Sequence, residues 1–356
     1  MLNYLNSFSQ NYSLALSSAF TGAILLAFYI FKSRVLNIPW YKEWKYVGKV
    51  SDLYMYPLKS GRFLKLKRAR CTTFGLKQFE EDERAFQMLD RFLVVYRDSD
   101  KSYCTSKTFP HMVLIEVTVH DQEYFAIDAP NMRTLYVKIP VTKEDKNNKD
   151  NIYLWGKQKV MTIDCGDEAA TWVSRYILDT ETGLRLGFHD GSERRSFEQD
   201  LPEYVEVYKN LKNESTGLYA DLANYLFVNE SSVNEVNSRL TDIQISHRNF
   251  RPNIVISDNK LPPFDEDNWE YIKINNLIFK FVKYCPRCLV VNIDVDTGSR
   301  IPGREPLNVM GSYRKLKDVK NIKLEGEHPL FGSYFDIIEG ENELIEVGAA
   351  VFVKKR

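Results

Sequence analysis

The sequence predicts a mainly β fold of the α+β class: two barrel-like β lobes with a few helices, preceded by one transmembrane helix. Three observations support this prediction. The first 31 residues contain no charged side chain. Beyond residue 49, short runs of β-branched and aromatic residues alternate with Gly, Asn, Asp and Pro, which is typical of strands joined by turns. Helix signals interrupt this pattern in only two stretches.

The composition excludes several classes of protein. The 356 residues are 44% hydrophobic and 27% charged, as in ordinary globular proteins and unlike disordered ones. Lys plus Arg equals Asp plus Glu, at 48 each, so no overall charge indicates binding to nucleic acid. The five cysteines are too scattered for a disulfide framework and fit a reducing compartment.

The uncharged N-terminal segment is long enough to cross a membrane. Residues 12–31 are apolar and would span about 30 Å as a helix. We therefore expect a membrane anchor over residues 1–34, with membrane contact through residues 12–31. Basic residues follow this run and none precedes it, which predicts that the C-terminal body faces the cytosol. A cleaved secretory signal is the alternative, although its basic first region is missing.

The body after the anchor is expected to consist mostly of strands. Examples of the expected strands are residues 50–56, 92–96, 113–119, 134–139, 253–256, 277–282 and 289–293. A helix is expected over residues 164–178, because its acidic first turn complements the helix dipole and its apolar residues lie on one face. Ser232 and Glu235 resemble a capping box that opens a second helix, ending near Leu240.

Two polar, turn-rich segments divide the body. Residues 143–150 are expected to form a loop tip, and residues 189–198 are interpreted as a linker. This places one lobe at residues 47–188 and the other at residues 189–354.

The closely spaced cysteines in Cys285-Pro286-Arg287-Cys288 are the first candidate site. A structural zinc site lacks its other ligands, since no second CxxC or CxxH occurs. A redox dithiol normally begins a helix, and this motif lies between two β-rich runs, which weakens that interpretation without removing it. A single thiolate beside an arginine would suit a soft metal held by a phosphorylated cofactor.

Three further motifs carry polar groups that could hold an anion. In residues 249–253, Pro252 is expected to force Arg251 into an extended conformation, so that Arg251 and Asn253 point the same way as a polar clamp. Residues 56–61 could form a phosphate-holding turn with Lys59 and Ser60, and Arg91 stands at the start of an apolar run. Taken singly, each is better explained as an ordinary surface turn or strand end.

These motifs, in this order, resemble the MOSC-domain proteins and, within them, the mitochondrial amidoxime-reducing components (mARC). The matching segments are YPLKS at 56–60, FGL at 74–76, DRF at 90–92, DCGDEAATW at 164–172, NSRL at 237–240, NFRPNIVIS at 249–257, CPRC at 285–288, DVDTG at 294–298, GREPL at 303–307 and HPLFGSYF at 328–335. They cover nearly the whole chain from about residue 49. The spacing of NFRPN, CxRC and DxDTG is specific.

The resemblance implies an N-terminal β-rich MOSC-N lobe and a MOSC β-barrel, with a molybdenum–molybdopterin cofactor between them. It implies that Cys288 is the only protein ligand of the molybdenum and the catalytic residue, and that Cys285 is not a ligand. The cofactor contacts that it implies are Lys59, Ser60, Arg91, Asp221, Leu222, Arg251, Asn253, Pro286 and Arg287, of which Asp221 and Leu222 match loosely.

The implied activity is a two-electron reduction of N–OH groups to N–H, with small N-oxygenated substrates such as amidoximes and hydroxylamines. In the family, NADH supplies the electrons through cytochrome b5 reductase and cytochrome b5. The implied location is the mitochondrial outer membrane, with the endoplasmic reticulum or peroxisomal membrane as alternatives. Two other functions stay open: a MOSC module that carries cofactor or sulfur without turnover, and a lipid- or partner-binding membrane protein.

The chain departs from the family pattern in two places. Residues 105–108 (TSKT) stand where the family carries an arginine and a glutamine, so a contact with substrate or cofactor is expected to differ. Residues 77–90 are longer than the family pattern and are expected to form an extra loop near the site.

Overall fold

The computed structural model describes residues 43–81, 85–140 and 149–356. The expected anchor, residues 1–34, lies outside the described residues, as does most of the expected loop tip at 143–150. Among the helices that the model describes, none is long and apolar enough to cross a membrane. Residues Lys45–Arg356 form one compact unit, and the following description concerns that unit.

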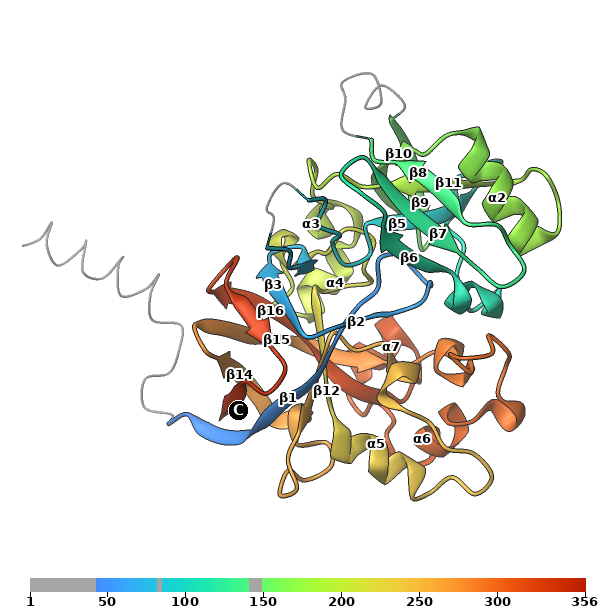
Figure 1. The fold of residues 1–356 in the computed structure, drawn as a ribbon. Coiled ribbons are helices and arrows are strands. Elements are labelled where there is room, and N and C mark those ends of the chain that lie inside the picture. Colours follow the sequence, from blue (N-terminus) through green and yellow to red (C-terminus); the bar gives the residue numbers. More distant parts are fainter. Residues whose placement is uncertain (1–42, 82–84, 141–148) are drawn as a thin grey trace, which may run out of the picture. The chain divides into compact units, whose positions relative to one another are not determined.

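Seven strands close into a barrel, the lower part of the body in Figure 1. In sequence order they are β1 (Lys45–Met55), β12 (Tyr225–Asn229), β13 (Ile254–Ser257), β14 (Trp269–Ile274), β15 (Leu277–Pro286), β16 (Leu330–Glu339) and β18 (Ala350–Lys355). All neighbours are antiparallel except β12 and β13. The first strand, β1, closes the barrel by pairing with both β13 and β18. Large buried side chains such as Phe227, Trp269 and Phe279 fill its core.

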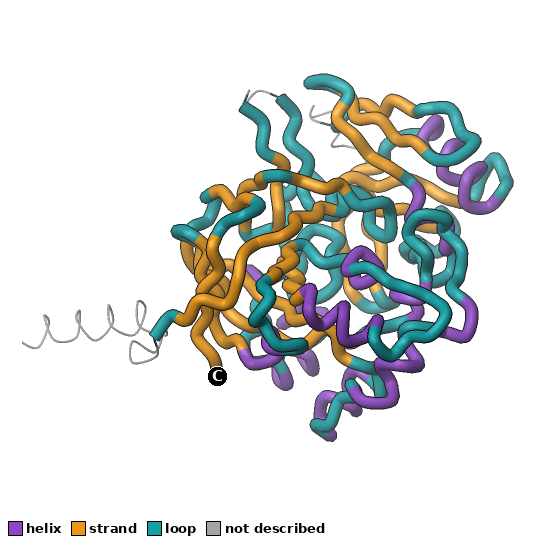
Figure 2. Tube along the Cα trace, turned by 60° about the horizontal axis from the view of Figure 1, so that its bottom comes forward, coloured by secondary structure: helices purple, strands orange, loops and turns teal. Residues whose placement is uncertain are grey.

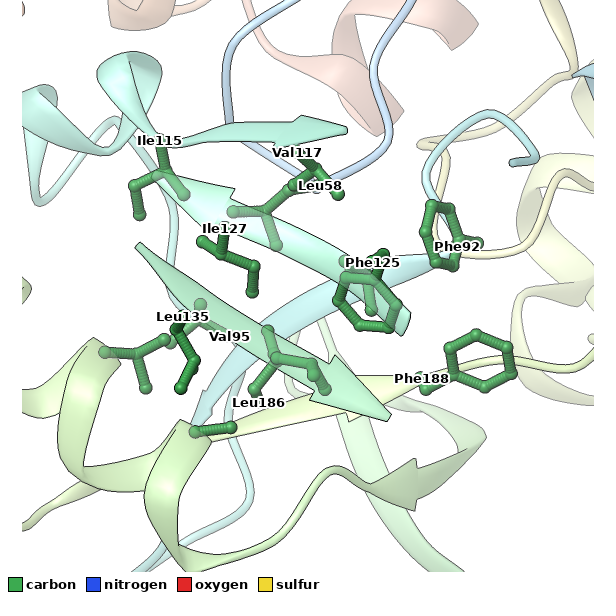
Figure 3. Packing of buried hydrophobic residues seen from close by; sticks show 14 of the residues in the cluster. Leu58, Phe92, Val95, Ile115, Val117, Phe125, Ile127, Leu135, Leu186 and Phe188 are labelled. Atoms are coloured by element: carbon green, nitrogen blue, oxygen red, sulfur yellow. The ribbon is translucent and has the colours of Figure 1, made fainter. Parts of the chain in front are cut away.

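A second lobe holds two smaller sheets and one long helix. The four-stranded sheet has the order β5 (Leu93–Arg97), β11 (Leu184–Phe188), β10 (Gln158–Asp164) and β9 (Lys149–Leu154), and the three-stranded sheet has β6 (Glu116–Val119), β7 (Tyr124–Asp128) and β8 (Leu135–Lys138). Helix α2 (Asp167–Leu178) packs against this lobe through Trp172, Val173 and Ile177. Figure 3 shows the apolar core, in which Phe92, Phe125 and Phe188 lie together.

The remaining elements are short. A small sheet joins β17 (Leu344–Glu346), β3 (Arg68–Thr72) and β4 (Gly75–Gln78), and β2 (Leu64–Leu66) pairs with β1. The short helices are α3 (Phe197–Asp200), α4 (Pro202–Val207), α5 (Glu230–Asn237), α6 (Leu307–Tyr313) and α7 (Val319–Glu325). Figure 2 shows most of the helices at the edge of the body rather than among the strands. The expected mainly β fold with some helices is therefore confirmed.

Some expected elements were wrong in type. Of the strand expected at residues 289–293, the first four residues form a 3-10 helix, η6 (Leu289–Asn292), and Ile293 makes only an isolated β-bridge. Residues 113–119 are divided between a 3-10 helix, η1 (Pro110–Leu114), and strand β6. A short apolar run can form either a buried strand or a buried turn of helix. Hydrophobic periodicity alone therefore could not distinguish the two structures.

The expected capping box at Ser232 was also wrong. The cap of helix α5 (Glu230–Asn237) is Asn229, three residues before the expected cap, and it accepts a hydrogen bond from the Ser231 N–H at 3.0 Å. Ser232 lies inside the helix, where its hydroxyl bonds the buried carboxylate of Glu266 at 2.8 Å. Its hydroxyl therefore serves tertiary packing instead of the helix end.

The segment expected to be a linker is packed into the body. His189, Arg195 and Phe197 are 2%, 4% and 0% exposed. A flexible linker would leave such side chains in solvent. The polar composition of residues 189–198 correctly indicated a loop. It did not indicate that three buried side chains anchor this loop.

Candidate functional site

The turn after strand β1 places Lys59 inside the protein. The Gly61 N–H donates to the Leu58 carbonyl at 2.9 Å, and Ser60 at the third position of this turn has φ 68°. Lys59 is 6% exposed, and its Nζ donates to the Tyr219 carbonyl at 2.9 Å and to Asp221 Oδ1 at 2.8 Å. Desolvation lowers the pKa of Lys59, although the Asp221 carboxylate opposes this shift.

Two arginines lie against the ring of Tyr56. The guanidinium carbons of Arg91 and Arg251 are 4.8 and 4.2 Å from its centroid, respectively. The Asp90 carboxylate accepts from the Tyr56 N–H at 2.8 Å and also pairs with the Arg91 guanidinium. The Arg91 N–H in turn donates to the Tyr56 carbonyl at 2.7 Å. These bonds therefore hold Arg91 in place and position the Tyr56 ring, against which Arg251 packs.

Arg251 has a different conformation from the expected one. It ends the 3-10 helix η4 (His247–Phe250) in the left-handed region, with φ 53° and ψ 46°. The extended conformation expected before Pro252 was therefore wrong, because closing the 3-10 turn requires the Arg251 N–H to reach the Arg248 carbonyl at 3.0 Å. The side chain turns towards Gly61, whose carbonyl accepts from Nη1 at 2.8 Å.

Asn253 does not form a clamp with Arg251. Its Oδ1 accepts from the Leu226 N–H at 3.2 Å, and its Nδ2 donates to the Tyr54 carbonyl at 3.3 Å. The side chain is 1% exposed and joins strand β13 to the neighbouring strands β1 and β12. The shared direction expected for the two residues was wrong, because Arg251 is not extended and the amide is used within the barrel.

Asp221 stands among the cations of this site. Its side chain is 57% exposed while that of its partner Lys59 is 7% exposed. Desolvation by the surrounding protein would raise the pKa of Asp221, but the charges of Lys59, Arg91 and Arg195 lower it to about 2. The carboxylate therefore stays ionised throughout the physiological range. The side chain of its neighbour Leu222 lies in an apolar cluster with Phe197 and so faces away from polar groups.

Sequence reasoning missed Arg195. Its guanidinium donates to Gln158 Oε1 at 3.1 Å and to the Asp221 carbonyl at 3.0 Å. Burial lowers its pKa to about 10, although the charges of Asp221 and Asp200 oppose this shift. Two adjacent arginines in a polar segment are typical of a solvent-exposed loop. The sequence therefore gave no indication that Arg195 is buried.

The two cysteines of the CPRC motif have different surroundings. Cys285 is 3% exposed in a core with Phe250 and Phe331, at the end of strand β15. Burial raises the pKa of this thiol. Cys288 is partly exposed and directly precedes η6. Both thiols are free, and Pro286 between them pairs in register with Leu330 of β16.

Arg287 connects the cysteine loop to the segment that carries Arg251. Its guanidinium donates to the Phe331 carbonyl at 2.8 and 2.6 Å and to the Phe250 carbonyl at 2.8 Å. The rings of Phe250 and Phe331 stack with centroids 3.6 Å apart. Arg251 follows Phe250 and Cys288 follows Arg287, so these bonds bring the two candidate residues close together. The Arg287 side chain is thus committed to backbone carbonyls.

The site has an excess of buried positive charge and unused donors. In the described part of the chain, the four cations Lys59, Arg91, Arg195 and Arg251 face three carboxylates, those of Asp90, Asp200 and Asp221. Within the described chain, three buried polar atoms of this group have no hydrogen-bond partner: Tyr56 Oη, Arg195 Nε and Arg251 Nη2. Unpaired buried donors are costly in a protein interior. A bound anion with several oxygens fits this arrangement.

Backbone strain is concentrated at the same place. Ser60, Arg91, Trp155 and Arg251 all have φ between 50° and 68°. Such conformations cost about 1 kcal/mol or more for residues other than glycine and gather at functional sites. Trp155 is part of the same site, since its ring centroid is 5.8 Å from Lys59 Nζ and 6.0 Å from the Arg195 guanidinium carbon.

A recess of about 500 Å³ lies elsewhere on the second lobe and contains none of these residues. It is lined by Asp98, Lys101, Lys149, Asp150, Asp164, Gly166, Asp167 and Arg185. Its cations are already paired with carboxylates, as in the bonds of Arg185 with Asp164 and of Lys101 with Asp150 at 3.0 Å. We therefore place the candidate site at the cationic cluster.

Two family models match the chain, and residues from both matched ranges lie in this cluster. The MOSC N-terminal beta barrel domain matches residues 47–180, and the MOSC domain matches residues 214–352. Mitochondrial amidoxime reducing component 2 of Bos taurus is 31% identical over 82% of this chain and 79% of its own length. The chain belongs to the MOSC-domain family of amidoxime-reducing components. Component 1 of Mus musculus is 32% identical over 86% of this chain and 82% of its own, and the Homo sapiens component 1 is 29% identical over 89% and 88%.

Both domains of this family member contribute to the cluster. Lys59, Arg91 and Tyr56 come from the range of the MOSC N-terminal match, whereas Asp221 and Arg251 come from that of the MOSC match. Arg195, which lies between the two matches, bonds to both sides through Gln158 and Asp221. The motifs singled out in the sequence are therefore gathered in space, although the exact role of each remains a prediction.

Proposed function

We propose that the protein is a molybdenum-dependent reductase of N-hydroxylated compounds, acting on amidoximes, hydroxylamines and related small molecules. The observation that carries this proposal is the cluster of buried cations and unpaired donors bonded to the loop of the accessible thiol Cys288. An anionic phosphorylated cofactor would satisfy the donors, and the thiol would supply one soft ligand to its metal. The membership in the amidoxime-reducing family supports the same conclusion.

The residues present fit a molybdenum–molybdopterin cofactor. Lys59, Arg91, Arg195 and Arg251 would neutralise its phosphate, with Tyr56 donating from its free hydroxyl. Cys288 would ligate the metal through its thiolate, while Cys285 stays in the core. The backbone of Pro286 and the turn at Ser60 would limit how the cofactor lies.

The bound cofactor would supply two-electron oxygen-atom chemistry. The reaction consumes two electrons and two protons and converts N–OH to N–H and water. The protein's own contribution is binding and orientation. The fixed turns at Ser60, Arg91 and Arg251 hold the charged groups in place before substrate arrives, so little reorganisation is needed. The carboxylate of Asp221 positions Lys59 through their 2.8 Å bond.

The electron donors and the location belong to the same proposal. NADH would supply electrons through cytochrome b5 reductase and cytochrome b5. The apolar residues 12–31 would anchor the chain, with the mitochondrial outer membrane as the proposed site and the catalytic body in the cytosol. The basic residues after the apolar run support this orientation, and the word mitochondrial in the names of the relatives supports the organelle.

The test is reduction of benzamidoxime by the molybdenum-loaded full chain with purified cytochrome b5, its reductase and NADH. We expect benzamidine to form with stoichiometric loss of NADH, and we expect tungsten-substituted protein to be inactive. Protein that contains molybdenum and pterin but forms no benzamidine would contradict the proposal. That result would favour a MOSC module that carries cofactor or sulfur without turnover.

A further inference from the structure

The segment that follows helix α6 exposes a row of lysines. Four lysines are exposed there, and we call them the basic strip: Lys315, Lys317, Lys320 and Lys323. The last two lie three positions apart in helix α7, so their side chains share one face of it. Val319 stands among them and is 79% exposed, more than any other large hydrophobic residue in the part of the chain that the structure describes. An apolar contact within a charged rim is the arrangement of a protein–protein interface.

The carboxylates of the same segment do not balance these lysines. Glu325 turns into the protein and pairs with Lys283, their side chains being 8% and 1% exposed, respectively. Asp318 caps helix α7, and Glu327 reaches Lys315 at 3.5 Å. Within this segment, four exposed lysines therefore stand against two exposed carboxylates, which leaves the outer surface positively charged.

Helix α7 is held in place by side chains that point inward. Leu324 joins the apolar cluster that contains Tyr208, and Glu325 makes the buried pair described above. Helix α4 packs against α7. It adds the exposed Glu206, and the exposed Lys209 follows its end, so the excess of positive charge is unchanged. The basic strip is therefore a fixed surface of the body.

The basic strip begins two paired segments away from the cysteine loop. Lys315 pairs with Pro329 in an antiparallel bridge, and the Pro329 carbonyl accepts from the Arg287 N–H at 2.8 Å. Since neighbouring paired segments lie about 4.8 Å apart, the backbone at Lys315 lies about 10 Å from the backbone of the loop that carries Cys288. A protein that binds to the strip would therefore come close to a metal on the Cys288 sulfur.

We propose that the basic strip is the docking surface for a one-electron donor protein that presents carboxylates around its redox centre. Opposite charges speed the encounter of two proteins and orient it, and Val319 would add an apolar contact. Anionic lipids also attract lysines, but the position of the strip beside the cysteine loop favours an electron donor. This inference rests on the proposed reductase function and adds the surface at which its donor binds.

Two donor molecules would dock in turn for each substrate molecule. Each gives up one electron and leaves oxidised, and for cytochrome b5 the haem iron passes from ferrous to ferric. With two protons from solvent, the two electrons convert one N–OH group to N–H and water. A small charged surface suits such repeated, short-lived encounters.

The experiment compares two electron donors on the molybdenum-loaded full chain. Reduction of benzamidoxime is followed with limiting reduced cytochrome b5 and, separately, with chemically reduced methyl viologen, a small donor that needs no docking surface. The ratio of the two rates reports docking separately from the chemistry at the metal. Both rates are measured at low salt and at about 0.5 M salt, where charges on two surfaces are largely screened from one another.

The chain allows a charge reversal with a matched control. Lys317→Glu combined with Lys320→Glu reverses half of the strip, and both positions lie at the N-terminal end of α7, where acidic side chains favour the helix. Lys138→Glu combined with Lys159→Glu makes the same change of net charge at exposed positions of β8 and β10, in the second lobe. Val319→Ser removes the apolar contact. Molybdenum content is measured on every variant.

We expect the strip variant to lose about tenfold in the ratio of the two rates at low salt, the lower end of the effect of electrostatic steering. At high salt it should approach the wild-type ratio, and the control variant should keep that ratio throughout. Val319→Ser should lose about fivefold at both salt concentrations, because an apolar contact is not screened.

An unchanged ratio in the strip variant overturns the inference, and so does an equal fall in the strip and control variants. A strip variant that keeps the ratio but no longer binds phosphatidylserine vesicles also overturns it, because the strip would then bind a membrane. Wild-type protein that forms no benzamidine with either donor contradicts the reductase function itself, which distinguishes the two failures.

Discussion

Cys285 and Cys288 are three positions apart and yet differ in accessibility. Cys285 is 3% exposed within a core, whereas Cys288 is partly exposed where strand β15 gives way to helix η6. The sequence singled out both thiols, and resemblance to the family was needed to favour the second. The difference arises from a change of secondary structure between the two residues, which the short motif does not encode.

His189 shows a buried titratable group that the sequence left undistinguished. Its ring is 2% exposed, packs against Tyr219 with centroids 5.4 Å apart, and accepts through Nδ1 from the Gly191 N–H at 3.0 Å. Burial lowers its pKa to about 4. Protonation of Nδ1 would also break the bond from Gly191. The folded protein therefore resists the proton that an unfolded histidine binds at about pH 6.5.

This depressed pKa predicts a loss of stability in acid. Between pH 6.5 and pH 4 the unfolded chain binds a proton at His189 that the folded chain does not, so the free energy of unfolding should fall by roughly 3 kcal/mol. His189→Asn keeps an acceptor near Nδ1 and should remove this part of the fall. Urea unfolding at pH 7 and pH 4 measures it, with the exposed His120→Asn as control. Equal losses in wild type and His189→Asn would contradict the assignment.

At the scale of elements, the sequence predicted the starts of several strands closely but misjudged some of the turns between elements. Strands β5, β8, β13 and β15 begin within one residue of expectation, and α2 begins within three residues. The wrong predictions concern segments where the chain changes direction, such as helix η6 and the turn at Arg251. Local preference before proline favours extended backbone, but the closing bond of η4 and the contact with Gly61 override it. Tertiary contacts that decide such turns are absent from the local sequence.

Gly332 in strand β16 illustrates a glycine that the site requires. It has φ 71°, and a Cβ atom there would lie 2.8 Å from the Phe227 carbonyl and 2.9 Å from a Val228 methyl carbon. The preceding carbonyl, that of Phe331, accepts two bonds from Arg287 beside Cys288. A side chain at this position would therefore displace the strand that orients the cysteine loop.

We expect Gly332→Ala to lower the free energy of unfolding by about 2–4 kcal/mol, the sum of a left-handed alanine and a tight core. Gly311→Ala is the matched control, because that glycine lies in helix α6 with open space around it. There alanine should stabilise by roughly 0.5–1 kcal/mol. Denaturant unfolding of both variants decides the matter, and equal effects of the two substitutions would contradict this role for Gly332.

At the scale of the whole molecule, the sequence predicted two β lobes but not how the chain closes the barrel. The first strand pairs with residues far along the chain, as in Lys49 with Ser257 and Lys45 with Val353. Pairing over such separations depends on the whole set of strands and leaves no local pattern. The aromatic and cationic members of the site, Tyr56, Trp155 and Arg195, were missed for the same reason, because each becomes distinctive only beside residues from other elements.

The proposed cofactor site depends on the whole molecule, since its cations come from both matched domains and from the segment between them. The most direct test is molybdenum and pterin quantification on the purified full chain, on Cys288→Ser and on Cys285→Ser. We predict that wild type and Cys285→Ser retain molybdenum and measurable turnover, whereas Cys288→Ser loses most of its molybdenum and all turnover. Wild-type protein without molybdenum after cofactor-competent expression, or equal losses in the two variants, would contradict the assignment of Cys288 as the ligand.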